Sequence, residues 1–266
     1  MFRVAPARLL IATAVGCLLL ALALRVSGFD QALFLAINEA AWRWAPPALL
    51  SCVTVLGNGL IAAMLLSVTL LRAPSRLMAG LFATPVAMVL SWLPKGLIDS
   101  PRPAAVLDPA SIHIVGMRLA AHNSFPSGHA VTAMLVAGVL LAGGAARPRG
   151  LAAAAIMLAG LAVALSRIAV GAHWPSDALA GVCLGLLAAV AGAQAERRWR
   201  LAERSAARPL LALVVLACAA ALARVDLGYP LARPLQIVSA GLGAGIALLT
   251  LWRAWAGRSS AARIPG

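Results

Sequence analysis

Apolar segments of about 20 residues recur along the whole chain, and they limit its possible folds more than any other feature. They lie at about 7–25, 48–71, 76–94, 128–146, 150–168, 174–194, 208–224 and 234–255. A helix needs roughly 20 mostly apolar residues to cross the hydrocarbon core of a bilayer. With 62% hydrophobic and 11% charged residues, the composition departs strongly from that of a soluble domain. The sequence therefore predicts an all-α fold, a polytopic membrane helix bundle.

The first apolar segment lies close to the N-terminus, where a cleaved signal peptide would also lie. Arg3 and Arg8 precede an apolar run at 9–24. This run is at the long end for the hydrophobic region of a signal peptide. We therefore predict that it is retained as the first membrane span.

The net charge of +14 does not indicate nucleic-acid binding, because the arginines form no single face or stripe. They stand at the ends of the apolar runs, which is typical of membrane topology and of contact with anionic lipids. With the N-terminus inside, fourteen of the 22 Lys and Arg residues fall on the cytoplasmic side. The positive-inside rule then predicts that both termini are cytoplasmic, and we expect no nucleic-acid partner.

Three polar clusters interrupt the apolar sequence. Lys95, the only lysine, begins the first, which ends at Arg102-Pro103. The second is Pro126-Ser127-Gly128-His129, and the third is Ser166-Arg167 followed by His173 and Asp177. Charges near a bilayer are costly and are seldom present without a function. The predicted topology places all three clusters on one side of the membrane, which would be the exterior or periplasmic side.

The cations of these clusters suit phosphate chemistry. Transfer of a phosphoryl group requires its charge to be neutralised, and it requires a nucleophile and a proton donor for the leaving oxygen. Lys95, Arg102 and Arg167 can supply the positive charge, and arginine offers a planar fork that fits phosphate. Ser127 and Gly128 lie at an expected helix start, where free N–H groups favour anions.

The two histidines suit the remaining roles. His173 and Asp177 are four residues apart at an expected helix start, so their side chains can meet on one face. A carboxylate on one ring nitrogen fixes the tautomer and leaves the other nitrogen to attack phosphorus. His129 would then protonate the departing oxygen. Each residue alone has an ordinary structural explanation, and only their combination indicates a site.

The clusters resemble the three-part signature of the type 2 phosphatidic acid phosphatase (PAP2) family, in its membrane lipid phosphatase branch. The matching motifs are Lys95-x6-Arg102-Pro103, Pro126-Ser127-Gly128-His129 and Ser166-Arg167-x5-His173-x3-Asp177. The resemblance covers roughly residues 76–194. It implies a six-helix core and hydrolysis through a phosphohistidine without a metal ion or other cofactor. By this resemblance His173 is the nucleophile, Asp177 its orienting partner and His129 the general acid. Lys95, Arg102, Ser127, Gly128 and Arg167 would bind the phosphate.

We expect three regions along the chain. Residues 1–72 would be N-terminal transmembrane helices, and 73–196 the catalytic core with an extracytoplasmic loop at 95–127. Residues 197–266 would be a basic cytoplasmic loop and two extra C-terminal transmembrane helices, which would pad the bundle or aid self-association. The loop residues Asp108, His113, Arg118, His122 and Asn123 are expected to be mainly solvated, with lipid-headgroup contact by Arg118 or His122 as the alternative.

The function expected from these features is hydrolysis of a lipid phosphomonoester or diphosphate in the cell (inner) membrane. Undecaprenyl diphosphate, phosphatidate, phosphatidylglycerol phosphate and lipid A phosphates all fit, with surrounding membrane lipids as further partners. A phosphotransferase with the same covalent intermediate is the alternative. A transporter or scaffold without catalysis fits less well, because no motif residue is missing. A haloperoxidase, which shares similar motifs, fits poorly because the chain has no sizeable soluble domain.

Overall fold

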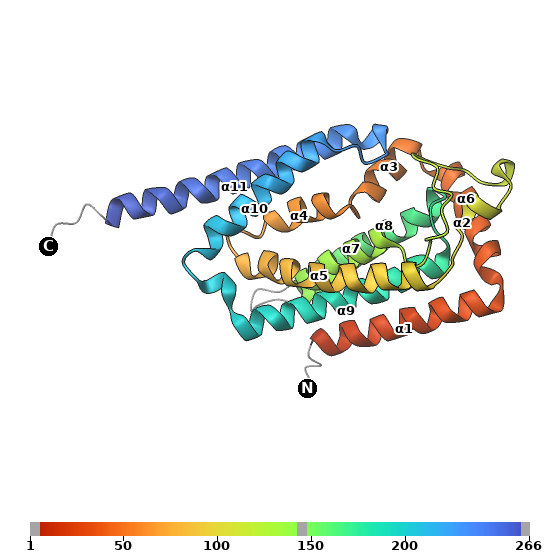
Figure 1. Ribbon diagram of the computed structural model, residues 1–266, viewed down its shortest axis with the longest axis horizontal. Helices are drawn as coiled ribbons and strands as arrows, with labels where there is room; N and C mark the ends of the chain where they lie inside the picture. Colours follow the sequence, from red (N-terminus) through yellow and green to blue (C-terminus); the bar gives the residue numbers. More distant parts are fainter. Residues whose placement is uncertain (1–5, 143–147, 262–266) are drawn as a thin grey trace.

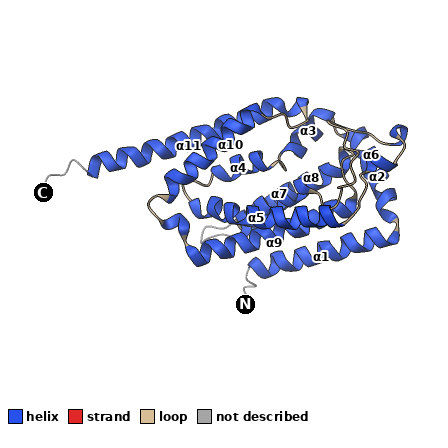
Figure 2. Ribbon diagram, in the orientation of Figure 1, coloured by secondary structure: helices blue, strands red, loops and turns tan. Residues whose placement is uncertain are grey.

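The computed structural model describes residues 6–142 and 148–261, and their side chains from 7 to 142 and from 148 to 256. These residues form helices and connecting loops and no β-strand (Figure 2). The all-α prediction is therefore confirmed. The long helices are α1 (Pro6–Ser27), α5 (Pro74–Leu97), α8 (Gly150–Ala169), α9 (Pro175–Trp199), α10 (Ala207–Arg224) and α11 (Arg233–Ala261).

These six helices are long and apolar enough to cross a membrane. They occupy six of the eight apolar segments that hydropathy identifies, including the two beyond the polar clusters. The segment at 128–146 gives a shorter helix, α7 (Gly128–Ala142), and its last residues lie outside the described part of the chain. The bundle is therefore polytopic, with the two extra C-terminal helices that the sequence predicts.

The segment at 48–71, which the sequence predicts to be apolar enough for a span, is not one continuous helix. It forms α3 (Pro47–Val55) and α4 (Gly59–Ser67), whose axes differ by 72°. The break falls at Gly57-Asn58-Gly59, and the Asn58 side chain accepts a hydrogen bond from the Leu60 N–H at 2.9 Å. Asn58 thus caps the start of α4, as short polar side chains do at helix N-termini. Together the two helices are long and apolar enough for one membrane span, which would be broken at the bend.

A further helix, α2 (Phe29–Trp44), lies where hydropathy predicts no span. It follows α1 directly, because Gly28 adopts a left-handed conformation with φ of 76° that side chains disfavour. In Figure 1 α2 runs across the ends of the long helices. Its Asn38 side chain bonds His113 and Ala169, so α2 holds the loops at that end of the bundle.

Helix α9 lies at the centre of the bundle, where it packs against α1, α5, α7 and α8. Its contact with α7 is closest at Gly181 and Gly185. A Cβ on Gly185 would lie 2.3 Å from the carbonyl oxygen of Val131, and one on Gly181 would lie 2.7 Å from the Ser127 oxygen. Small residues let helix backbones approach closely in lipid. This approach brings the second polar cluster, at the start of α7, against the third.

The remaining helices are short and lie between the long ones. They are α6 (Pro103–Val106), η1 (Pro109–Ser111), η2 (Leu201–Glu203) and η3 (Pro230–Ala232). The loop with α6 lies with α2 and α3 at one end of the bundle, whereas α1 begins and α11 ends at the other (Figure 1). The polar clusters all occur at the end that carries α2 and α6.

Candidate active site

The third cluster lies where α8 ends and α9 begins, in a tight turn. The carbonyl oxygen of Arg167 accepts hydrogen bonds from the N–H groups of Ala172 and His173, at 3.0 and 3.1 Å. Gly171 adopts φ of 77° within this turn. The main chain therefore fixes His173 directly beside Arg167. Both side chains are buried.

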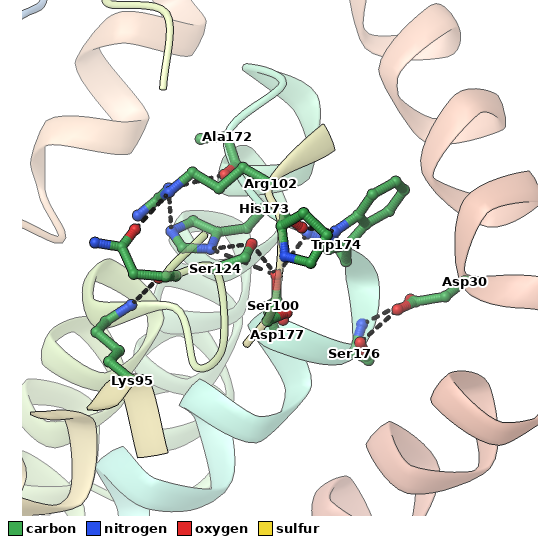
Figure 3. A network of polar contacts seen from close by, with 12 residues as sticks. Asp30, Lys95, Ser100, Arg102, Ser124, Ala172, His173, Trp174, Ser176 and Asp177 are labelled. Carbon is green, nitrogen blue, oxygen red and sulfur yellow. Dashed lines mark hydrogen bonds and ion pairs between the residues drawn. The ribbon is translucent and has the colours of Figure 1, made fainter. Parts of the chain in front are cut away.

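His173 reaches Asp177 through a serine that the sequence interpretation does not include. Ser124 donates from its Oγ to Asp177 Oδ2 at 2.5 Å, and the same Oγ lies 3.4 Å from His173 Nδ1 (Figure 3). The direct distance from His173 Nδ1 to Asp177 Oδ2 is 3.6 Å, which is too long for a good hydrogen bond. Asp177 also accepts from the Trp174 N–H at 3.0 Å. Ser124 therefore contacts both members of the expected pair, and His173, Ser124 and Asp177 form a chain.

This arrangement determines which nitrogen of His173 carries the proton. The Ser124 hydroxyl gives its hydrogen to Asp177, so its oxygen is left to accept a hydrogen from His173 Nδ1. On the other side of the ring, Arg102 Nη1 lies 3.2 Å from His173 Nε2. An arginine can only donate, so Nε2 presents its lone pair. The Nε2 lone pair of His173 therefore faces the guanidinium group of Arg102.

The charges around His173 keep it neutral. Burial, followed by the positive charges of Arg102, Arg167 and Lys95, lowers the pKa of His173 well below its ordinary value. Burial and the neighbouring Arg167 also lower the pKa of Arg102. Because like charges and burial both disfavour cations, this cluster would be stabilised by an anion.

Arg102 is oriented by its neighbours in the loop and the turn. Its Nε donates to Asn123 Oδ1 at 3.1 Å, and its Nη1 donates to the Ala172 carbonyl at 2.9 Å. Lys95, in the last turn of α5, donates to the carbonyl of the same Asn123 at 2.6 Å. Asn123 is exposed, as the sequence interpretation expects, and it also joins the two cations of the first cluster.

Arg167 is held from the opposite side by two residues that sequence reasoning misses. Its Nη1 donates to Thr54 Oγ1 in α3 at 2.5 Å and to the Tyr229 hydroxyl at 2.8 Å. Within the described part of the chain its Nε is buried and has no hydrogen-bond partner. A buried, unpaired donor is costly, and a phosphate oxygen would satisfy it.

Ser127 and Gly128 begin α7 beside Asp177. The Ser127 N–H donates to the Asp177 carbonyl at 3.0 Å, which joins the second cluster to the third. Ser127 is fully buried, and among the described residues its hydroxyl has no partner. A second unsatisfied donor is thus available next to the cations, at a helix N-terminus where anions are favoured.

His129 faces a cavity between α4, α5 and α7. This cavity has a volume of about 450 Å³. Its lining is mostly apolar and includes Ala63, Thr84, Met88 and Trp92. Gly57, at the break between α3 and α4, permits the close approach to His129, because a Cβ there would lie 2.8 Å from the His129 Cβ. The bend in the α3–α4 pair therefore shapes the wall beside His129.

The other loop residues lie away from these contacts. Arg118 donates to the Ala104 carbonyl at 3.1 Å, and the exposed His122 pairs with Asp99 at 2.9 Å. His113 bonds Glu39 at 2.8 Å and stacks on Trp42. Asp108 caps η1 through the Ala110 N–H. Lipid-headgroup contact by Arg118 or His122 stays a prediction.

The first two helices also reach the site, which no sequence pattern indicates. Arg25, at the end of α1, lies 3.9 Å from Asp177 Oδ1 and donates to Ser100 Oγ at 3.4 Å. Asp30, at the start of α2, accepts from the N–H and the hydroxyl of Ser176. These contacts fix the first turn of α9, which carries Asp177. Among the described residues, no three His, Cys, Asp or Glu side chains form a group that could hold a metal ion.

Comparison with known proteins agrees with this geometry. Residues 75–201 match the sequence profile of the PAP2 superfamily. This part of the chain therefore forms a PAP2-superfamily domain, and the resemblance found in the motifs is confirmed. No curated protein matches the chain in sequence.

One solved structure is similar, the crystal structure of LpxE from Aquifex aeolicus. Its TM-score is 0.55 at 24% identity, over 62% of this chain and 95% of the LpxE chain. At this identity the likeness shows a common fold. The family, the fold and the apolar helices together support a membrane lipid phosphatase in general terms.

Proposed function

We propose that this protein hydrolyses a lipid phosphomonoester or diphosphate through a phosphohistidine formed on His173. The observation that carries the proposal is the Nε2 lone pair of His173, which faces Arg102 across 3.2 Å. A phosphate bound by Arg102 would lie next to this nitrogen. Ser124 and Asp177 on the opposite side of the ring hold the proton on Nδ1.

Two displacements complete the reaction. His173 Nε2 attacks phosphorus, and the bond from phosphorus to the leaving oxygen breaks as His129 protonates that oxygen. Water then attacks the phosphohistidine while His129 takes its proton, the P–N bond breaks, and inorganic phosphate is released. The positive charge on the imidazole after the attack is stabilised by Asp177 through Ser124. Arg102, Arg167, Lys95, the Ser127 hydroxyl and the Gly128 N–H would stabilise the equatorial oxygens.

The cavity beside His129 supports a lipid as the substrate. It begins at the catalytic histidine and continues between α4 and α5 along apolar side chains. An acyl or prenyl chain could pass from the bilayer into this cavity without crossing water, and packing against the apolar side chains would hold it there. The leaving oxygen of such a lipid would lie at the junction of the chain and the phosphate, next to His129. A long-chain lipid phosphate therefore suits both parts of the site.

The proposal also includes the orientation of the protein in the membrane and a reaction without a metal ion. The polar end would face the exterior or the periplasm, with both termini in the cytoplasm, because fourteen of the 22 Lys and Arg residues fall on the opposite side. We propose that no metal ion takes part, since Arg102, Arg167 and Lys95 supply the positive charge that a metal would otherwise provide.

The test is phosphate release by the purified protein in detergent with EDTA. Substrates are undecaprenyl diphosphate, phosphatidate, phosphatidylglycerol phosphate and lipid A, and the variants are His173→Ala and the exposed His122→Ala. We expect release by the wild type and His122→Ala and none by His173→Ala. Alkaline quenching during turnover should trap phosphate on His173. Release that needs an added metal would contradict the metal-free mechanism, and release only with a lipid acceptor would indicate a phosphotransferase.

A further inference from the structure

Tyr229 belongs to a part of the chain outside the PAP2-superfamily domain and still reaches the site. The residue lies in the turn between α10 and α11, 62 positions from Arg167. Its side chain is buried, and its hydroxyl accepts a hydrogen bond from Arg167 Nη1 at 2.8 Å. The Arg167 guanidinium also lies 5.9 Å from the centre of the Tyr229 ring. The C-terminal helices therefore do more than enlarge the bundle.

The turn that carries Tyr229 is held firmly. Gln236 donates to the carbonyls of Leu222 and Val225 at 2.6 and 2.8 Å. Arg233 donates to the carbonyls of Val225 and Ala223. Both residues come from α11 and satisfy carbonyl groups at the C-terminal end of α10, which otherwise lack partners. The two helices thus form a hairpin whose tip has little freedom.

The tip is also attached to the loop that carries Arg102. The Met117 N–H donates to the Gly228 carbonyl at 3.1 Å. The Tyr229 ring lies against Gly116, where a Cβ would come within 2.6 Å of the ring carbons. Gly116 has a φ of 82°, a conformation that favours glycine. The position of the Tyr229 hydroxyl is therefore set by the hairpin and by this loop together.

The two anchors of Arg167 determine how its guanidinium group points. Thr54 and Tyr229 both bond Nη1, whereas the buried Nε has no partner among the described residues. Because the guanidinium group is planar and rigid, fixing Nη1 between two hydroxyls also fixes the direction of the Nε–H bond. The main chain of Arg167 bonds His173, so this donor lies in the catalytic turn.

We propose that Tyr229, with Thr54, is a positioning residue for Arg167, and that the α10–α11 hairpin is therefore needed for phosphate binding. The inference rests on the proposed function only in treating Arg167 as a phosphate ligand. Loss of the Tyr229 hydroxyl would leave Nη1 held by Thr54 alone, so Arg167 could rotate about that contact and its Nε would be directed less well at the phosphate. Phosphate affinity should then fall while the fold is retained.

The test compares Tyr229→Phe, Thr54→Val and the double variant with the wild type. Thr54→Ser, which keeps the hydroxyl, is the rescue variant. Thr250→Ala is the control, because it removes a hydrogen bond to the Ile246 carbonyl within α11, away from the turn that carries Tyr229. Each protein is titrated with inorganic phosphate by calorimetry, its kcat and KM are measured, and its thermal unfolding is followed.

We expect Tyr229→Phe to weaken phosphate binding roughly tenfold, the effect of losing one hydrogen bond to a charged group. The double variant should weaken it further, and Thr54→Ser should bind like the wild type. Thr250→Ala should leave phosphate affinity within about twofold.

Equal phosphate affinity in the wild type and Tyr229→Phe would overturn the inference, and so would the absence of phosphate binding in both. A parallel loss in Thr250→Ala would do the same, since it would indicate that any change in α11 weakens binding. A wild type that binds phosphate tightly but releases none from any lipid would instead refute the proposed function, and the titration would still decide the role of Tyr229.

Discussion

Arg102 and His173 meet nitrogen to nitrogen, with Arg102 Nη1 3.2 Å from His173 Nε2. The same Nη1 donates to the Ala172 carbonyl, and Arg102 Nε donates to Asn123. Arg102 is therefore fixed beside His173 Nε2. In the proposed mechanism the group that would bind the phosphate also lies next to the nucleophilic atom.

Replacing Arg102 with lysine should show that activity requires the planar guanidinium group of Arg102 as well as its positive charge. Lysine keeps the positive charge but cannot bond Asn123, Ala172 and phosphate at once. We expect Arg102→Lys to lower kcat/KM by about 10²–10³, the usual effect of losing one transition-state donor. Steady-state kinetics on the preferred lipid would measure it. Arg118→Lys, at an arginine that bonds only the Ala104 carbonyl, is the matched control, and an equal loss there would contradict the prediction.

Ser124 should matter to catalysis although it lies outside the three motifs. It connects His173 Nδ1 to Asp177 Oδ2, so Ser124→Ala removes the acceptor that holds the Nδ1 proton. A net hydrogen bond contributes about 1 kcal/mol, so we expect kcat to fall about fivefold. Asp177→Asn should reduce kcat much more, because the imidazole then loses its stabilising charge. A Ser124→Ala enzyme with full kcat would show that Asp177 acts on His173 directly.

The pKa of His173 sets the acid limit of activity. Burial and the neighbouring cations lower this pKa well below the ordinary value of 6.5. His173 must be neutral to attack, and a lowered pKa keeps it neutral as the pH falls. We therefore expect kcat/KM, which reports the free enzyme, to show no loss from protonation of His173 between pH 8 and pH 6.5. An acid limb centred near 6.5 that persists in His122→Ala would contradict this.

The spans and motifs are predictable from the sequence because both signals are local. Hydropathy identifies the stretches that become α1, α5 and α8 to α11, and each motif keeps its internal spacing. The sequence Gly57-Asn58-Gly59 is a local signal for the bend between α3 and α4. The mean hydropathy of the whole segment obscures it. Helix α2 is too short and too polar for a hydropathy window.

The supporting residues of the site are unpredictable for a different reason. Ser124 meets Asp177 across 53 positions, Tyr229 meets Arg167 across 62, and Thr54 meets Arg167 across 113. Such contacts have no periodicity, and a lone serine, threonine or tyrosine has no distinctive neighbours. These contacts depend on how the helices pack. The glycines of α9 and the bend between α3 and α4 determine that packing, and their effect appears only once the chain is folded.

The packing of α7 on α9 should depend on Gly185. A Cβ there would lie 2.3 Å from the Val131 oxygen and 2.9 Å from the Met134 Cβ, so Gly185→Ala must separate the two helices. Overpacking of this kind costs typically 1–3 kcal/mol. Gly245→Ala in α11 is the matched control, since nothing lies within 4 Å of its Cβ. Thermal unfolding in detergent should show a lower midpoint for Gly185→Ala and an equal or higher one for Gly245→Ala.

The cavity beside His129 should select for the lipid chain. Ala63 lies in its wall, and Ala63→Phe would fill part of the volume that an acyl or prenyl chain is proposed to occupy. We expect KM for a long-chain lipid phosphate to rise about tenfold, since overpacking of this kind costs typically 1–3 kcal/mol and about 1.4 kcal/mol is a tenfold change in affinity. Hydrolysis of a short-chain, water-soluble phosphate ester should change little, because the phosphate contacts are untouched. Ala154→Phe on the exposed face of α8 is the control and should affect neither substrate. If Ala63→Phe slowed both substrates equally, the cavity would be a structural part of the site and the chain would bind elsewhere.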